Sequence, residues 1–272
     1  MKDLAIIIIG YKTRGLLKNC LNSIFENLKD SSLDYQVIVV DNHSQDGTIE
    51  MIKERFPQVK LIALDKNYGY ARAVNKGIKA IEAKYYFILN PDTLFLEKKV
   101  IDRLYQFMEE NPKIGMVGPK LINPDKTIQP SCCRFPSFLI PLYRRTGLGK
   151  LPWVKKKIEK FLMLDWNHQE RRPVDWVLGT GMFVRAKAIK EVGLMDERFF
   201  MFFEDTDWCR RFWEKNWPVY YFADAEIVHY HGRPSLNRGG IWDLFFNRGT
   251  RIHIQSWLKY FLKYLFKKRP RN

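Results

Sequence analysis

The chain has 272 residues and a formal net charge of +16, and 46% of its residues are hydrophobic. This apolar content is enough for a real core and excludes global disorder. No apolar run approaches the roughly 20 residues of a membrane-spanning helix, and the opening apolar run is too short for a signal peptide, so we expect a cytoplasmic protein. The four cysteines show no metal-type spacing, and we expect them to be reduced.

Strands and helices alternate through the first half of the chain. Short apolar runs predict strands at residues 4–9, 35–40, 59–64, 85–89 and 114–118. Helical spacing and helix-start signals predict helices at 17–28, from Thr48 onward, at 70–82 and at 96–108. This alternation is typical of an α/β fold with a parallel sheet covered on both faces. Residues 124–175 contain six prolines, and we expect loops and short helices there.

Polar residues directly follow four of the predicted strands. They occupy Gly10–Lys12, Asp41–Thr48, Asp65–Gly77 and Asn90–Thr93. Ligands of open α/β sheets bind beyond the carboxyl ends of the strands, so these positions are expected to carry the chemistry. The sequence lacks the G-x-G-x-x-G pattern after the first strand and the G-x-x-x-x-G-K-[ST] phosphate loop, which excludes the usual dehydrogenase and P-loop signatures.

Five motifs in order carry a family resemblance: "VIVVDNHSQDGT", "NYGYARAVNKG", "FILNPDT", "GTGMFVRAKAIKEVGLMDERFFMFFEDTDWCRR" and "IVHYHGRPS". With them the chain resembles glycosyltransferase family 2, in its bacterial rhamnosyltransferase-like branch. The resemblance implies a GT-A fold with a mixed sheet, divided into a nucleotide-sugar-binding half (1–120) and an acceptor-binding half (121–235). It also implies inverting transfer of a sugar from a dTDP- or UDP-sugar, with rhamnose as first choice, to a hydroxyl of a glycan or lipid-linked acceptor in cell-surface polysaccharide synthesis.

The resemblance also assigns residues to the nucleotide. They are Gly10, Tyr11, Asp41, Asn67, Arg72 and Asn75. Asp41 matches the family aspartate that accepts hydrogen bonds from the pyrimidine or ribose. Its alternative role is to cap the helix after Gly47, although Asp46 is better placed for that. Arg72 could equally be a solvated helix residue.

A divalent metal, Mg²⁺ or Mn²⁺, is implied at Asp92 and His229. Asp92 matches the family's acidic motif, in which the first carboxylate is here Asn90. Hard oxygen ligands suit these ions. Two alternatives stay open: Asp92 could instead cap the next helix, and His231 could replace His229 as the ligand.

The acidic segment "EDTDW" follows a run of phenylalanines. Inversion requires a base for the acceptor hydroxyl, and apolar surroundings raise the pKa of a carboxylate toward a useful range. By resemblance, Asp205 is the base and Glu204 positions the acceptor. Asp207 is expected to pair with Arg210 or Arg211. The competing interpretation is a helix N-terminus enriched in acids for structural reasons.

Residues 236–272 form a basic tail that we expect to be a separate membrane-association segment. Three lysines recur every four residues at Lys259, Lys263 and Lys267, and apolar residues fall on the opposite side of the same helix: Trp257, Leu258, Phe261, Leu262 and Leu265. This pattern is typical of a helix in a membrane interface, here the anionic inner face of the cell membrane. The alternative is a helix docked on the protein's own core.

Two other classes of protein fit parts of the sequence. A basic, aromatic-rich chain could bind nucleic acid, but the charge lies away from the strand-end motifs, and we expect no nucleic-acid partner. A sugar nucleotidyltransferase would share the nucleotide half but typically begins with a glycine-rich loop that "IGYKTRG" matches poorly.

Overall fold

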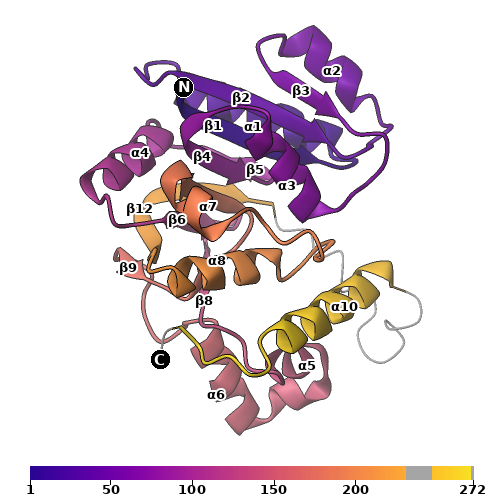
Figure 1. Cartoon of the computed structure of the whole chain (residues 1–272), viewed down its shortest axis with the longest axis vertical. Coiled ribbons are helices and arrows are strands. Elements are labelled where there is room, and N and C mark those ends of the chain that lie inside the picture. The colour runs from indigo at the N-terminus through magenta and orange to yellow at the C-terminus, as the bar shows by residue number, and fades with distance from the viewer. Residues whose placement is uncertain (231–246, 271–272) are drawn as a thin grey trace.

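The computed structural model describes residues 1–230 and 247–270 and is built around one mixed sheet (Figure 1). The main strands are β1 (Lys2–Gly10), β2 (Tyr35–Asp41), β3 (Lys60–Ala63), β4 (Ala83–Leu89), β5 (Thr93–Leu94), β6 (Met116–Ile122), β11 (Gly181–Arg185) and β12 (Val219–His229). Their order in the sheet is β3-β2-β1-β4-β11-β6-β12-β5. Short strands β7 (Ile128–Gln129) and β9 (Arg172–Pro173) extend it by pairing with β6 and β12.

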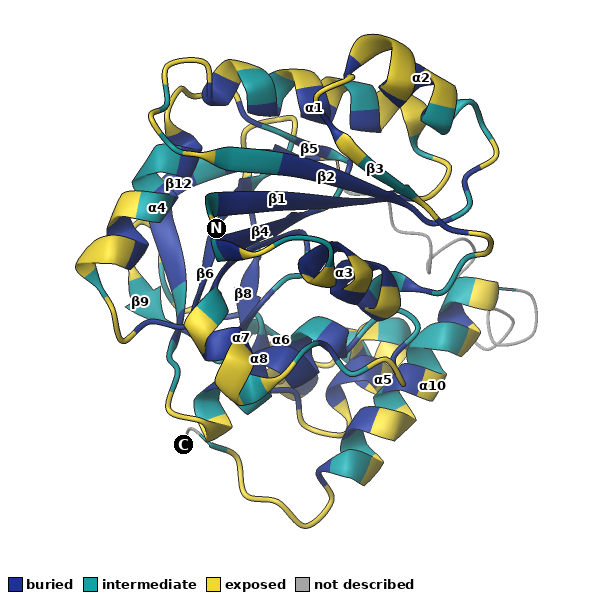
Figure 2. Cartoon of the chain, turned by 45° about the horizontal axis from the view of Figure 1, so that its top comes forward, coloured by how far each residue is buried: buried dark blue, intermediate teal, exposed yellow. Residues whose placement is uncertain are grey.

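The first four strands of this sheet are parallel and confirm the predicted α/β alternation. They are joined by α1 (Arg14–Asn27), α2 (Thr48–Arg55) and α3 (Tyr70–Lys79), and α4 (Val100–Glu110) precedes β6. Alternate residues of β1 face opposite sides of the sheet: Ile6 and Ile8 pack with α1, α2 and α4, whereas Ile7 packs with α3. Both faces of the sheet are therefore covered, and its central strands are buried (Figure 2).

The sheet is mixed, as the family resemblance implied, because β11 departs from the parallel arrangement that the alternation alone predicted. This strand lies between β4 and β6 and is antiparallel to both. The chain leaves the sheet after β6, runs through the proline-rich segment, and returns in the opposite direction. Gly181 then pairs with Leu89, which places Thr180 beside Asn90, and the Asn90 amide donates to the Thr180 carbonyl at 3.0 Å.

The proline-rich segment contains short helices and loops, as predicted. It holds α5 (Ile140–Arg145), the 3₁₀ helix η1 (Gly147–Lys150) and α6 (Pro152–Phe161). Strand β8 (Cys132–Cys133) pairs with β10 (Trp176–Val177) in a separate two-stranded sheet. All four cysteines are buried and free of disulfide bonds.

Two helices follow β11, and the second of them carries the acidic motif. They are α7 (Ala186–Val192) and α8 (Glu204–Glu214). The buried face of α8 packs Trp208 and Phe212 into the same core as α3. Because α3 begins just after the third polar strand end, this packing brings the acidic motif toward the nucleotide half.

The C-terminal helix α10 (Arg248–Lys263) is docked on the body of the protein beside α5 (Figures 1 and 2). Tyr260 and Tyr264 are buried against Phe199 and Phe203. Residues 247–270 thus pack on the body, as in the alternative of a docked helix, and the boundary at residue 236 and the membrane association stay predictions. Residues 231–246, which include His231, lie outside the described part of the chain. Within the described ranges, no helix combines the length and apolar composition needed to cross a bilayer.

Candidate active site

The residues that were predicted to bind the nucleoside include the ends of β1 and β2. The register pairs Gly10 with Asp41, and the Asn42 amide donates to the Gly10 carbonyl at 2.8 Å. Asp41 is 1% exposed; its Oδ2 accepts from the Ser44 amide at 3.1 Å. Its Oδ1 is buried and accepts no hydrogen bond from any described residue. A buried, unpaired carboxylate oxygen is costly unless a ligand N–H or O–H supplies the missing bond.

The loop after β3 closes one side of this region. Asn67 Oδ1 accepts from the Gly69 amide at 2.9 Å, so this side chain shapes the turn. Gly69 has φ +85°, and a Cβ there would lie 2.3 Å from the Phe200 carbonyl oxygen. The absence of a Cβ at Gly69 lets the two segments come close enough for the Tyr70 amide to donate to the Phe200 carbonyl at 2.7 Å. The nucleotide loop is thereby fixed to the turn that precedes the acidic motif.

Three other predicted nucleotide ligands lie in different settings. Tyr11 is 41% exposed at the end of β1, with the Lys12 ammonium 5.5 Å from its ring centroid. Arg72 is half exposed and pairs with Glu197 at 3.1 Å. Asn75 is buried, and its amide group bonds Met195 N and O at 3.0 and 2.9 Å. Asn75 therefore joins α3 to the segment before α8, a structural role that sequence reasoning missed.

The predicted metal ligands meet at the edge of the sheet. Asp92 follows β4, His229 ends β12, and the register pairs His229 with Thr93. His229 Nε2 lies 3.4 Å from Asp92 Oδ1. On its other side, His229 Nδ1 hydrogen-bonds the Gln129 side-chain oxygen at 2.9 Å. An oxygen acceptor on one ring nitrogen places the proton there and presents the other nitrogen as a ligand.

These two residues fit a divalent ion in part. Asp92 Oδ1 is buried and accepts no hydrogen bond from the rest of the described chain. No cluster of three or more Asp, Glu, His or Cys residues with metal-site geometry occurs in the described residues. The protein thus offers two donors, and a Mg²⁺ or Mn²⁺ ion that takes its other ligands from diphosphate and water would suit such a site.

Asn90, which replaces a carboxylate in the motif, has a structural role. Its side-chain nitrogen lies 3.4 Å from the Thr180 hydroxyl, and its backbone amide donates to the Thr180 carbonyl. It therefore connects the metal loop to β11 and to the glycine-rich turn before it. Asp92 remains the carboxylate of this loop.

The acidic pair sits at the start of α8 on a strained turn. Phe202 and Phe203 have φ values of +71° and +67°, which are rare for bulky residues. Such conformations persist where the surroundings impose them, and they cluster at functional sites. Here they reverse the chain so that Glu204 and Asp205 begin the helix.

The two carboxylates have different hydrogen bonds. Asp205 is partly exposed; its Oδ2 accepts from the Gly179 amide at 2.9 Å and its Oδ1 from the Thr206 amide at 2.7 Å. Glu204 is 6% exposed, and its buried Oε2 accepts no bond from a described residue. Burial raises the pKa of Asp205, and these amides oppose the shift. Burial raises the pKa of Glu204 well above its ordinary value, and the charge of Asp205 adds to the shift. The amide bonds therefore favour the charged form of Asp205, whereas Glu204 Oε2 has no such donor among the described residues.

Tyr70 connects the acidic pair to the other sites. Its hydroxyl donates to the Gly179 carbonyl at 2.6 Å. Because Asp205 accepts from the Gly179 amide, Tyr70 and Asp205 bond to the carbonyl and the amide of the same residue. Burial raises the pKa of Tyr70, and the charges of Glu204, Asp205 and Asp92 raise it further. The three carboxylates therefore all lie near enough to Tyr70 to affect its pKa. The tyrosine lies inside a quoted motif, but nothing in the sequence distinguished it from its neighbours.

Asp207 confirms the predicted ion pair with Arg211 and adds a contact that the sequence did not indicate. It is fully buried, and Arg211 Nε donates to its Oδ2 at 2.9 Å. Its Oδ1 accepts from Lys263 at 2.5 Å and from the Tyr264 hydroxyl at 2.8 Å. Helix α8 is therefore bonded directly to the C-terminal segment.

A family model described as glycosyl transferase family 2 matches residues 5–158, more than half of the chain. The chain belongs to glycosyl transferase family 2. This assignment favours the glycosyltransferase interpretation over the nucleotidyltransferase alternative.

Two curated relatives are rhamnosyltransferases by name. The N-acetylglucosaminyl-diphospho-decaprenol L-rhamnosyltransferase of Mycobacterium tuberculosis is 31% identical over 71% of this chain and 66% of its own length. The dTDP-rhamnosyl transferase RfbF of Shigella flexneri is 28% identical over 86% of this chain and 71% of its own length. The chain thus spans slightly less than two thirds of the mycobacterial protein.

Solved structures of glycosyltransferases share the fold. A mannosyltransferase, PcManGT, from Pyrobaculum calidifontis in complex with GDP-Man and Mn²⁺ aligns over 98% of this chain and 67% of its own, with a TM-score of 0.60 and 15% identity. TarS of S. aureus aligns over 84% of this chain and 60% of its own, with a TM-score of 0.56 and 14% identity. The mixed sheet and these neighbours confirm the GT-A fold.

Proposed function

We propose that the protein is an inverting, metal-dependent glycosyltransferase that moves rhamnose from dTDP-rhamnose to a hydroxyl of a lipid-linked glycan acceptor in cell-surface polysaccharide synthesis. The activity class follows from the family. The donor and the acceptor are inferred from the names of the mycobacterial and Shigella relatives.

One structural observation carries the proposal. Asp41, Asp92 and Glu204 each bear a buried carboxylate oxygen that accepts no hydrogen bond from the described residues. They come from the end of β2, the loop after β4 and the start of α8. A nucleoside diphosphate sugar supplies a base or ribose donor, a metal-bound diphosphate and a reacting sugar in that order, so the three positions suit the three parts of one donor.

The residues can be given separate tasks. Asp41 Oδ1 would accept from the imide N–H of thymine or from the ribose, and the exposed Tyr11 directly follows Gly10, the register partner of Asp41. Asp92 and His229 would hold the metal, with Gln129 fixing the imidazole. When bound, a divalent ion neutralises the charge that develops on the departing diphosphate.

Asp205 would act as the general base. The Gly179 and Thr206 amides fix its orientation and favour its charged form, while Glu204 keeps the proton of the pair. As the acceptor oxygen bonds to the anomeric carbon, its proton passes to Asp205 and the bond to the diphosphate breaks. A single displacement of this kind inverts the anomeric configuration.

The lipid-linked acceptor implies a place at the cytoplasmic face of the membrane. The net charge of +16 supports contact with anionic lipid. No nucleic acid forms part of the proposal.

A donor panel tests the proposal. The protein is incubated with Mn²⁺ and, in turn, dTDP-rhamnose, dTDP-glucose, UDP-glucose, UDP-galactose and UDP-N-acetylglucosamine, and release of nucleoside diphosphate is measured. We expect the fastest release from dTDP-rhamnose. Preferential turnover of a UDP-sugar would refute the proposed donor, and the absence of turnover with every donor and acceptor would refute the proposed activity.

A further inference from the structure

The C-terminal helix α10 contacts the body of the protein through lysines and aromatic residues and leaves leucines exposed. Its lysines contact the body of the protein: Lys259 donates to the Arg198 carbonyl at 2.8 Å, and Lys263 pairs with Asp196 at 2.7 Å as well as with Asp207. Its leucines do not, since Leu262 and Leu265 are 71% and 63% exposed. The aromatic residues of this segment do face the body, since Tyr260 and Tyr264 are buried and Trp257 and Phe261 pack beside them, so its exposed apolar surface consists of the leucines and Phe266.

Exposed apolar side chains are concentrated in this part of the molecule. Of the sixteen large apolar residues that are exposed in the described chain, seven lie within 138–164 and four within 258–266. The first group contains Phe138, Leu139, Leu142, Leu148, Leu151, Trp153 and Leu164, and the second Leu258, Leu262, Leu265 and Phe266. Contiguous exposed apolar surface of this kind marks a site of protein or membrane interaction.

Aromatic contacts join the two groups. The Phe138 ring lies 4.7 Å from the Trp257 ring and 5.2 Å from the Phe261 ring on α10. Tyr143 of α5 in turn contacts Trp153 of α6 at 6.0 Å. The helices α5 and α10 lie side by side at one end of the molecule, with α6 next to α5 (Figure 1). We call residues 138–164 and 257–269 together the apolar-basic face.

The charges on this face are almost all positive. Residues 138–164 contain seven Lys or Arg and one acid, Glu159, and residues 257–269 contain five Lys or Arg and no acid. The ammonium of Lys157 lies 5.0 Å from the exposed Trp153 ring. Tryptophan flanked by lysine is typical of a membrane interface, where the ring meets the acyl boundary and the cation meets the headgroups.

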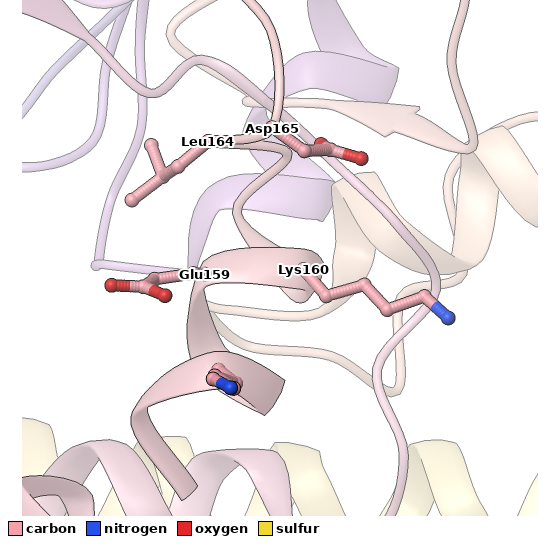
Figure 3. A pocket seen from close by; sticks show the side chains of 5 residues that line it. Glu159, Lys160, Leu164 and Asp165 are labelled. Atoms are coloured by element: carbon pink, nitrogen blue, oxygen red, sulfur yellow. The ribbon is translucent and has the colours of Figure 1, made fainter. Parts of the chain in front are cut away.

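The basic residues are dispersed and do not form a pocket for one phosphate group. A hollow of about 500 Å³ on α6 is lined by Lys156 and Lys160, but Glu159, Leu164 and Asp165 line it too (Figure 3). In the close view, Lys160 extends away from Glu159. Scattered cations around apolar side chains suit a charged surface better than a single anion.

We propose that the apolar-basic face docks on an anionic lipid bilayer and that the central segment 138–164 contributes to this contact together with α10. The proposal deepens the proposed function by naming the surface at which a lipid-linked acceptor is met. It rests on that function only for the identity of the acceptor. Lys263 and Tyr264 bond to Asp207, so the proposed face is joined directly to the helix that carries the acidic pair.

Vesicle sedimentation with the full chain tests the proposal without using catalysis. We compare phosphatidylcholine vesicles with vesicles that also contain phosphatidylglycerol. The variants are Leu262→Glu with Leu265→Glu on α10, and Trp153→Glu on α6. Leu96→Glu is the matched control, because Leu96 is 70% exposed, close to the 71% of Leu262, but lies between β5 and α4. Melting temperature and dTDP binding are measured for each protein.

We expect the wild type and Leu96→Glu to bind the anionic vesicles, and each face variant to bind roughly tenfold less tightly with unchanged melting temperature and dTDP affinity. Raising the ionic strength from about 0.1 M to about 1 M should weaken binding, since it shortens the Debye length from about 10 Å to about 3 Å.

If Trp153→Glu bound the vesicles as tightly as the wild type, residues 138–164 would not contribute to membrane contact. Failure of the wild type to bind anionic vesicles would overturn the proposal, and a dimer that the face variants dissociate would assign the face to a second copy. Loss of donor turnover in all proteins would count against the proposed function alone.

Discussion

Asp205 Oδ2 and the Gly179 amide nitrogen lie 2.9 Å apart, and this bond joins the start of α8 to the turn before β11. The bond gives Asp205 a donor that Glu204 Oε2 does not find among the described residues. Hydrogen-bond donors stabilise the charged form of a carboxylate, so this difference supports the proposal that Asp205, rather than Glu204, is the base.

Glu204→Gln should be mild for catalysis and favourable for stability. If Glu204 is protonated, glutamine reproduces its neutral state, because burial raises the pKa of Glu204. The acidic limb of the pH–rate profile should then be unchanged. We expect this limb above the ordinary pKa of an aspartate, because burial also raises the pKa of Asp205. A carboxyl whose pKa is higher in the folded than in the unfolded state costs stability as pH rises above the unfolded value of about 4.3. We therefore expect a higher melting temperature at pH 7 than in the wild type, and no difference near pH 3. A collapse of turnover in this variant would move the base to Glu204.

Asp41→Ala should weaken dTDP binding with or without metal, because it removes the unpaired acceptor Oδ1. Removal of one buried hydrogen bond of this kind typically costs about 1–3 kcal/mol, or roughly 5- to 150-fold in affinity. Asp46→Ala is the matched control, since Asp46 bonds the Thr48 amide at 3.2 Å at the start of α2. Isothermal titration measures both, and equal losses in the two variants would contradict the nucleotide role of Asp41.

Asp92→Asn should remove the part of nucleotide affinity that depends on Mn²⁺ and leave the metal-free affinity unchanged. Gln129→Leu should lower metal affinity about 10- to 100-fold without touching the ion, because Gln129 orients His229. Titration of dTDP in Mn²⁺ and in EDTA measures the difference. If both variants show the wild-type response to Mn²⁺, the metal lies elsewhere.

Asp207→Asn should destabilise the fold strongly. It leaves Arg211 and Lys263 facing a neutral, fully buried side chain, and breaking a buried ion pair in this way typically costs about 3–5 kcal/mol. Glu159→Gln is the control, because its pair with Lys155, also four residues apart, is exposed and should contribute less than about 1 kcal/mol. Urea unfolding compares the two. Similar midpoints would show that α10 is not held through Asp207.

The sequence predicted the first half of the fold well, because β1 to β4 and their helices are formed by local apolar periodicity. Local periodicity did not reveal the antiparallel β11, since a short buried strand carries no signal of its direction, and the mixed sheet was expected only from the family resemblance. The residues at the strand ends, such as Asp41 and Asp92, could be found because the topology of open sheets fixes where ligands bind.

Partners distant in sequence could not be found. Gln129 bonds His229, which lies 100 residues later in the chain. Gly179 bonds Asp205, which lies 26 residues later. No local sequence pattern encodes either contact. The tail shows a similar limit. The lysine row and the apolar row of α10 were both visible, but the bonds of Lys263 to Asp196 and Asp207 were not, because these acids lie more than fifty residues earlier.

The most direct test of the account is transfer by Asp205→Asn. With dTDP-rhamnose, Mn²⁺ and a lipid-linked acceptor, transfer is measured by product formation and the anomeric configuration of the product by NMR. We expect the wild type to invert the configuration, and Asp205→Asn to lose about 10²- to 10⁴-fold in transfer with unchanged dTDP and Mn²⁺ affinity, because asparagine cannot take the proton. A product with retained configuration, or near wild-type transfer by Asp205→Asn, would contradict the proposed mechanism.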